Sequence, residues 1–189
     1  MIHFGVAILS LLLATTPGPA AVGKPAPDFK ALDENGSSHE LAQYRGRAVV
    51  LEWTNSDCPF VERHYSADTM EKLAVALGAS VVVWLAVNST YTNTPADTRA
   101  WRASQGFAYP TLQDADGSIG HLYGARTTPH LFVIDAKGVL RYEGAIDDDP
   151  YGKAATPVNY VGGAVKALLA GASPDPTETK PYGCSVKYK

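Results

Sequence analysis

The sequence predicts one α/β domain, a three-layer α/β/α sandwich around a mixed central sheet. Two apolar stretches, residues 48–53 and 80–87, have the character of buried strands, and a helical stretch follows each of them. Two further strand candidates, 131–135 and 140–144, flank a Lys-Gly turn and form a hairpin, which makes the sheet mixed. This alternation of strands and helices is typical of a sheet covered by helices on both faces.

The remaining elements follow from turn signals and helical spacing. Asn35-Gly36 favours a tight hairpin near the start of the domain. Apolar residues at helical spacing predict one long helix from Pro59 to Leu77, which Gly78 ends. Further helices are expected at 95–105, 118–123 and 158–169.

Composition restricts the class of protein. The chain has 189 residues, of which 46% are hydrophobic and 19% are charged, as expected for one globular domain with extensions. The net charge of −3 and the lack of a Lys/Arg-rich run argue against nucleic-acid binding.

The first twenty residues have a different character from the rest. Residues 4–14 form a nearly unbroken apolar run that is too short to span a bilayer, and small residues follow it. This pattern predicts a signal peptide over residues 1–20, although no Lys or Arg precedes the run. We therefore expect an exported protein, periplasmic or extracellular, that is not membrane-bound after cleavage. An uncleaved anchor or a buried N-terminal segment remains the alternative.

Cys58 is the residue around which a reactive site is expected. It lies between a buried strand and a helix, and Pro59 suits the first helical position. A cysteine at the helix N-cap faces free backbone N–H groups and the positive end of the helix dipole, which stabilise a thiolate. The polar neighbours Asn55 and Asp57 indicate an accessible loop, although Asp57 and Glu62 would raise the thiol pKa.

Cys184 is the other of the two cysteines, and the sequence leaves its role open. It could resolve an oxidised Cys58, form a permanent structural disulfide with it, or stay free. It lies in a tail, 173–189, that is rich in Pro, Thr and charge and is expected to be irregular surface chain. The rest, 21–172, would form the domain.

Several motifs, in order along the chain, resemble the peroxiredoxin-like redoxins of the alkyl hydroperoxide reductase/thiol-specific antioxidant branch of the thioredoxin superfamily. The motifs are residues 22–29, 44–51, 58–65, 127–129, 132–135 and 182–188. The resemblance implies a thioredoxin-like sandwich in which Pro129, in a cis bond after Thr128, faces Cys58. It also implies that the backbone beside Pro129 can pair with an extended substrate segment.

The chain departs from this branch at two places. Relatives with a C-x-x-C pair carry a second cysteine where this chain has Asn55 or Val61. Peroxiredoxins place Pro and Thr at the spacings of Leu51 and Asn55, and their activating Arg has no clear counterpart here. A local dithiol is therefore impossible, and efficient peroxidase activity is not supported.

The resulting hypothesis is an exported thiol oxidoreductase acting through Cys58, with Cys184 as its resolving partner. The reaction would be thiol–disulfide exchange or hydroperoxide reduction, without a cofactor or metal. An external dithiol donor or a protein disulfide would be the partner, and Asn55, Pro59, Thr128 and Pro129 would shape the binding site. The alternative is a non-catalytic thioredoxin-fold binding module or metal-handling protein. His64 is expected to be a surface or packing residue, and residues 147–149 a solvated loop.

Overall fold

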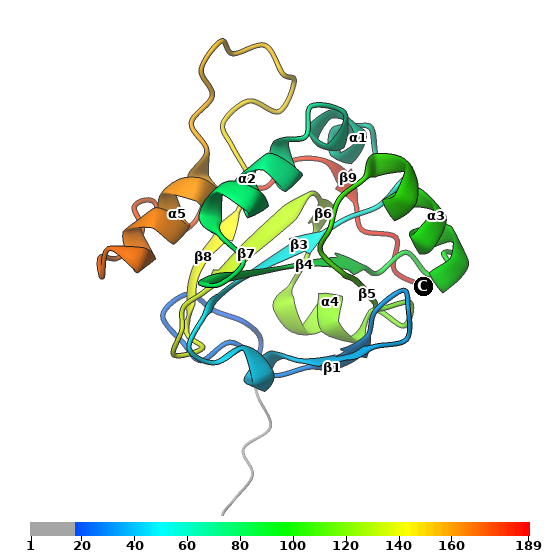
Figure 1. The fold of residues 1–189 in the computed structure, drawn as a ribbon, viewed down its shortest axis with the longest axis horizontal. Coiled ribbons are helices and arrows are strands. Elements are labelled where there is room, and N and C mark those ends of the chain that lie inside the picture. Colours follow the sequence, from blue (N-terminus) through cyan, green and yellow to red (C-terminus); the bar gives the residue numbers. More distant parts are fainter. Residues whose placement is uncertain (1–17) are drawn as a thin grey trace, which may run out of the picture.

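The computed structural model describes residues 18–189, so the predicted signal peptide lies almost wholly outside the described residues. A five-stranded mixed sheet forms the centre, in the order β5-β4-β3-β7-β8 (Figure 1). Its strands are β3 (Ala48–Trp53), β4 (Val82–Asn88), β5 (Thr111–Gln113), β7 (His130–Ile134) and β8 (Leu140–Gly144). Among the described residues, no helix is both long enough and apolar enough to cross a membrane.

The register of the sheet sends alternate side chains to its two faces. β3 pairs in parallel with β4, with Ala48 opposite Val82, and antiparallel with β7, with Trp53 opposite His130. Side chains are directed alternately to opposite sides along each strand, so the two faces form two separate apolar clusters. The predicted mixed α/β/α sandwich is confirmed.

One face of the sheet carries most of the helices (Figure 1). They are α1 (Pro59–Ser66), α2 (Thr69–Leu77), α3 (Pro95–Gln105) and α5 (Tyr160–Leu169). Val61 and Met70, on α1 and α2, are fully buried with Val165 of α5 against the sheet. The helix-covered face therefore holds the first cluster, which also contains Cys58.

The opposite face is covered by shorter elements. They are α4 (Ser118–Tyr123), the 3-10 helix η1 (Leu41–Tyr44) and the hairpin β1 (Lys30–Leu32) and β2 (Ser38–Glu40). Tyr123 packs its ring on Trp53 and Phe132 of the sheet. The hairpin turns at Gly36, which has φ +85°, as the Asn-Gly signal predicts.

The expectation of a single helix over 59–77 is wrong. Two helices, α1 and α2, occupy this stretch and are separated at Asp68, whose φ of 52° is left-handed. The apolar spacing continues through the break because both helices bury residues against the same face, including Tyr65 and Leu77. Periodicity alone therefore did not reveal the bend.

The tail is more regular than expected. Two residues form β9 (Cys184–Ser185), which pairs antiparallel with β6 (Thr127–Thr128), directly before Pro129. Figure 1 shows the tail, in red, passing from the α5 side along β6 toward α3. The expectation of irregular surface chain is therefore corrected at β9, where the partner strand lies far away in the sequence.

Candidate active site

Cys58 is the N-cap residue of α1, and a short turn separates it from the end of β3. Its backbone is extended, with φ −92° and ψ 115°, and Pro59 is the first helical residue. Its carbonyl oxygen accepts the first helical hydrogen bond, from the N–H of Glu62 at 2.9 Å. The sulfur therefore lies at the N-terminus of α1, where a negative charge is favoured.

The turn before Cys58 is held by Asn55. The Asn55 side-chain oxygen accepts a hydrogen bond from the backbone of Asp57 at 2.9 Å, and its carbonyl accepts one from Cys58 N–H at 3.1 Å. Asn55 is buried and shapes the backbone through these bonds, whereas Pro59 is exposed. These two residues set the start of α1.

Cys58 is 1% exposed, so the accessible thiol expected from its polar neighbours is wrong. The side chain belongs to the apolar cluster, and the Sγ atom donates a hydrogen bond to the carbonyl oxygen of Thr128 at 2.9 Å. Of its polar neighbours, Asp57 is exposed, whereas Asn55 is buried with the sulfur. The tail then covers it, which no local sequence pattern could indicate.

Thr128 connects the two cysteines. In the antiparallel β6–β9 pair it lies opposite Cys184, and its carbonyl oxygen accepts from Cys58. The bond from Thr128 to Pro129 is cis, as the resemblance implies. The structure therefore brings together four of the expected site residues: Cys58, Thr128, Pro129 and Cys184.

The two thiols have opposite pKa shifts. Burial acts to raise the pKa of Cys58. Hydrogen bonding to the Thr128 side chain, to the side chain and backbone of Cys184 and to the backbone of Val61 outweighs burial, so the pKa of Cys58 is lowered. Burial, together with the hydrogen bond and charge of Cys58, raises the pKa of Cys184 to about 11. The arrangement favours a thiolate on Cys58 and a protonated thiol on Cys184. In the described structure both cysteines are free.

A polar cluster beside Cys58 was not recognised from the sequence. His64 is fully buried. Asp147 and Asp149 are 5% and 7% exposed, so the expectation of a solvated loop at 147–149 is wrong for both of these residues. Burial and the charge of Arg63 lower the pKa of His64 to about 4. The Tyr182 hydroxyl joins the cluster, bonding to Asp147 at 2.5 Å and His64 at 2.9 Å. The only sequence signal was the position of Tyr182, two residues before Cys184.

A second buried group lies under the helices. Glu52 of β3 is fully buried, and its carboxyl group accepts hydrogen bonds from Tyr65 at 2.9 Å, Trp84 at 2.7 Å and Tyr109 at 3.4 Å. Burial raises the pKa of Glu52 to about 7, although these donors oppose the shift. The carboxyl group is thus held by three aromatic donors and lies six residues before Cys58 in the chain.

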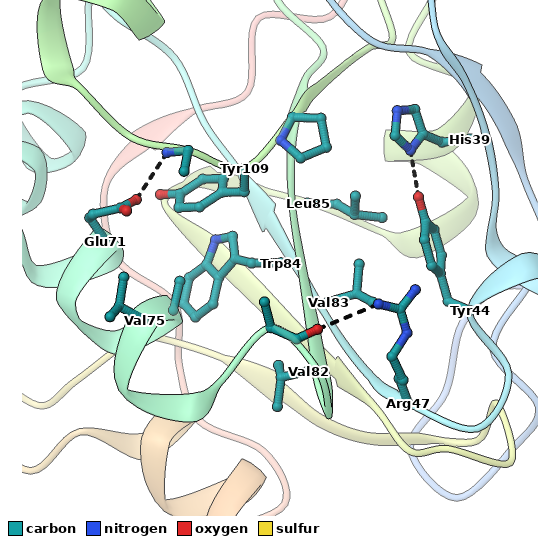
Figure 2. A pocket seen from close by; sticks show the side chains of 14 residues that line it. His39, Tyr44, Arg47, Glu71, Val75, Val82, Val83, Trp84, Leu85 and Tyr109 are labelled. Carbon is teal, nitrogen blue, oxygen red and sulfur yellow. Dashed lines mark hydrogen bonds between the residues drawn. The ribbon is translucent and has the colours of Figure 1, made fainter.

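A cavity of about 590 Å³ opens between α2, β4 and η1 (Figure 2). Val75, Val82 and Trp84 form its apolar wall, and Arg47 and Glu71 lie at its rim. Figure 2 shows that Glu71 and Arg47 are occupied by hydrogen bonds to backbone groups. Neither cysteine lines this cavity, so the reactive pair lies elsewhere in the molecule.

A metal site is not found among residues 18–189, since no three His, Cys, Asp or Glu side chains converge there. The chemistry available at the site is that of the two thiols and the polar cluster beside them.

Comparison with known proteins places this geometry in a family. Residues 22–143 match the AhpC/TSA family. The thiol:disulfide interchange protein DsbE of Yersinia pestis is 31% identical over 153 residues, covering 77% of each chain. Peroxiredoxin-2 of Cricetulus griseus is 33% identical over 161 residues, covering 72% of this chain and 74% of that one.

A solved structure is similar over almost the whole chain. The hypothetical protein SMc02350 of Sinorhizobium meliloti 1021 superposes with a TM-score of 0.81 at 27% identity, covering 91% of this chain and 97% of that one. The order of the elements, the thiol at the N-terminus of α1 and the family match agree with one another. The chain is therefore a thioredoxin-fold member of the AhpC/TSA family of thiol oxidoreductases.

Proposed function

We propose that this protein is an exported thiol oxidoreductase in which Cys58 is the nucleophile and Cys184 resolves it. The observation that carries the proposal is the pairing of Cys184 with Thr128 while the Cys58 sulfur bonds to the same Thr128. The opposite pKa shifts of the two thiols support the assignment of the roles, because the thiolate is the attacking species.

The proposed reaction with a hydroperoxide proceeds in balanced steps. The Cys58 thiolate attacks the O–O bond, forms a sulfenic acid and releases an alcohol or water after protonation. The thiol of Cys184 then displaces water from the sulfenic acid and forms the Cys58–Cys184 disulfide. An external dithiol reduces this disulfide, is itself oxidised to a disulfide and returns both thiols to the protein.

With a protein disulfide the same residues act in the same order, but the bond attacked is an S–S bond. Cys58 attacks one sulfur, which breaks the substrate S–S bond, releases one substrate thiolate and forms a mixed disulfide. Cys184 then displaces the second substrate thiol and forms the Cys58–Cys184 disulfide, which the external dithiol reduces. The names of relatives are of both kinds, a thiol:disulfide interchange protein and a peroxiredoxin, so both substrates stay within the proposal.

The test is the intact mass of the reduced full-length protein after one equivalent of hydrogen peroxide and then alkylation. We expect the mass to fall by two hydrogen atoms and both thiols to resist alkylation, because the chain has only these two cysteines. Cys184→Ser should instead retain a sulfenic acid on Cys58, and Cys58→Ser should not react. Full alkylation of both thiols after peroxide, and after incubation with a protein disulfide, would contradict the proposal and favour a binding or metal-handling role.

A further inference from the structure

The ring of Tyr182 fills a socket beside the site, which we call the Tyr182 socket. It consists of Phe60, Arg63, His64 and Asp147. The Tyr182 ring lies 6.0 Å from that of Phe60 and stacks on His64 with centroids 6.2 Å apart. The phenol ring of Tyr182 therefore packs against two rings of α1.

The hydroxyl group of Tyr182 has three polar partners in the socket. It donates to the Asp147 carboxylate at 2.5 Å and accepts from the Arg63 guanidinium at 3.3 Å. His64 Nε2 lies 2.9 Å from the same oxygen. Bonds to ionised groups are about twice as strong as bonds between neutral groups, so the phenol is a firm anchor for the tail.

This anchor is connected to Cys184 by one residue. Gly183 lies directly against the Thr128 carbonyl, and the following residue pairs with Thr128 in the β6–β9 ladder. Displacing the phenol from its socket would therefore move the residue that lies beside Cys58. It would also uncover Cys58, which is 1% exposed when the tail is in place.

We propose that Tyr182 is a positioning residue that latches the tail, holding Cys184 on Thr128 and closing Cys58 from solvent until the tail is released. This inference rests on the proposed function for the role of Cys184. It adds that the reductant or any protein substrate must meet Cys58 with the tail strand released, because β9 occupies the edge of β6 when latched.

The test measures how often the latch opens. In the reduced full-length protein, the alkylation rate of Cys58 is followed by peptide mass spectrometry for wild type, Tyr182→Phe and Tyr151→Phe. Tyr151 is the control, because it is 70% exposed and its phenol makes none of the socket bonds. Losing a hydrogen bond to a charged group should raise the open fraction, and so the alkylation rate, about tenfold in Tyr182→Phe alone.

A second readout separates positioning from a purely structural role. After peroxide, the Cys58 sulfenic acid should persist longer in Tyr182→Phe, because Cys184 is less often in place to react with it. Dimedone added at a fixed time should therefore trap more of it than in wild type. Asp147→Asn, which keeps an acceptor but loses the charge, should change both readouts in the same direction by less.

Equal alkylation rates in Tyr182→Phe and Tyr151→Phe would overturn the latch. So would an increase that merely follows a loss of global stability, seen as a matching fall in Tm. A wild-type protein that never forms the Cys58–Cys184 disulfide would contradict the proposed function instead, while the alkylation rates would still report on the latch.

Discussion

Gly183 lies so close to Thr128 that a Cβ atom on Gly183 would meet the Thr128 carbonyl oxygen at 2.0 Å. Its φ of +133° is also one that side chains disfavour. The carbonyl that accepts the hydrogen bond of Cys58 is thus covered by the backbone of the tail. The close approach of the two segments depends on glycine directly before Cys184.

Gly183→Ala should therefore release β9 from β6. The methyl group cannot be accommodated without moving backbone atoms, so the pairing of Cys184 with Thr128 is lost while the central sheet keeps its own contacts. We expect slower disulfide formation after oxidation and faster hydrogen exchange at the Val186 amide, which donates to the Arg126 carbonyl at 3.1 Å.

Gly163→Ala is the matched control for that experiment. Gly163 is on α5, and a Cβ there meets no atom within 4 Å. Alanine is favoured over glycine in a helix by about 1 kcal/mol, so this variant should be neutral or slightly more stable. Unchanged exchange at Val186 in Gly183→Ala would contradict the close approach.

The buried carboxyl group of Glu52 makes stability depend on pH. Its pKa is raised from 4.5 to about 7 in the folded state, so the folded protein holds a proton between these values that the unfolded chain has released. The free energy of unfolding therefore falls as pH rises from about 4.5 to about 7. Above that range the carboxyl group is ionised in both states, and the whole cost of burying its charge is present.

Glu52→Gln removes this ionisation and keeps an amide that can bond to Trp84 and Tyr65. Relative to wild type, the variant should gain up to about 3 kcal/mol in free energy of unfolding between pH 4.5 and pH 8. Urea unfolding at a series of pH values measures the difference. A difference that does not change with pH would show that Glu52 is not the titrating group.

The framework of the fold could be predicted because its signals are local. The apolar run of β3 and the capped start of α3 are each carried by neighbouring residues. Thr94 forms a capping box with Asp97, and Pro95 occupies the first turn, so α3 begins where the sequence indicates. β5 was not predicted, because three residues are too few to show a period.

The candidate site could be predicted in its parts but not in its assembly. Cys58 was recognisable from its place before a helix, and Pro129 from the resemblance to the redoxins. The cover over Cys58 and the Tyr182 socket depend on contacts between residues about 120 positions apart, such as His64 with Tyr182. Such contacts are set by the tertiary fold, and the local composition of the tail favours exposed chain instead.

His130 supplies a final prediction, on the acid side of the stability curve. It is 1% exposed on β7, its Nδ1 accepts from the Arg126 amide at 3.2 Å, and burial with the Arg126 charge lowers its pKa to about 3. The unfolded chain protonates this histidine near pH 6.5 while the folded protein does not. Stability is therefore lost as pH falls below about 6.5, at about 1.4 kcal/mol per pH unit.

His64, with its pKa lowered to about 4, acts in the same direction, and Glu52 acts in the opposite one between pH 4.5 and 6.5. These three groups together leave one net proton taken up on unfolding. His130→Asn keeps an acceptor for the Arg126 amide and removes one of the two histidine protons. The slope of unfolding free energy against pH in this window should fall by about 1.4 kcal/mol per unit. An unchanged slope would mean that His130 is protonated in the folded protein, which its burial beside Arg126 opposes.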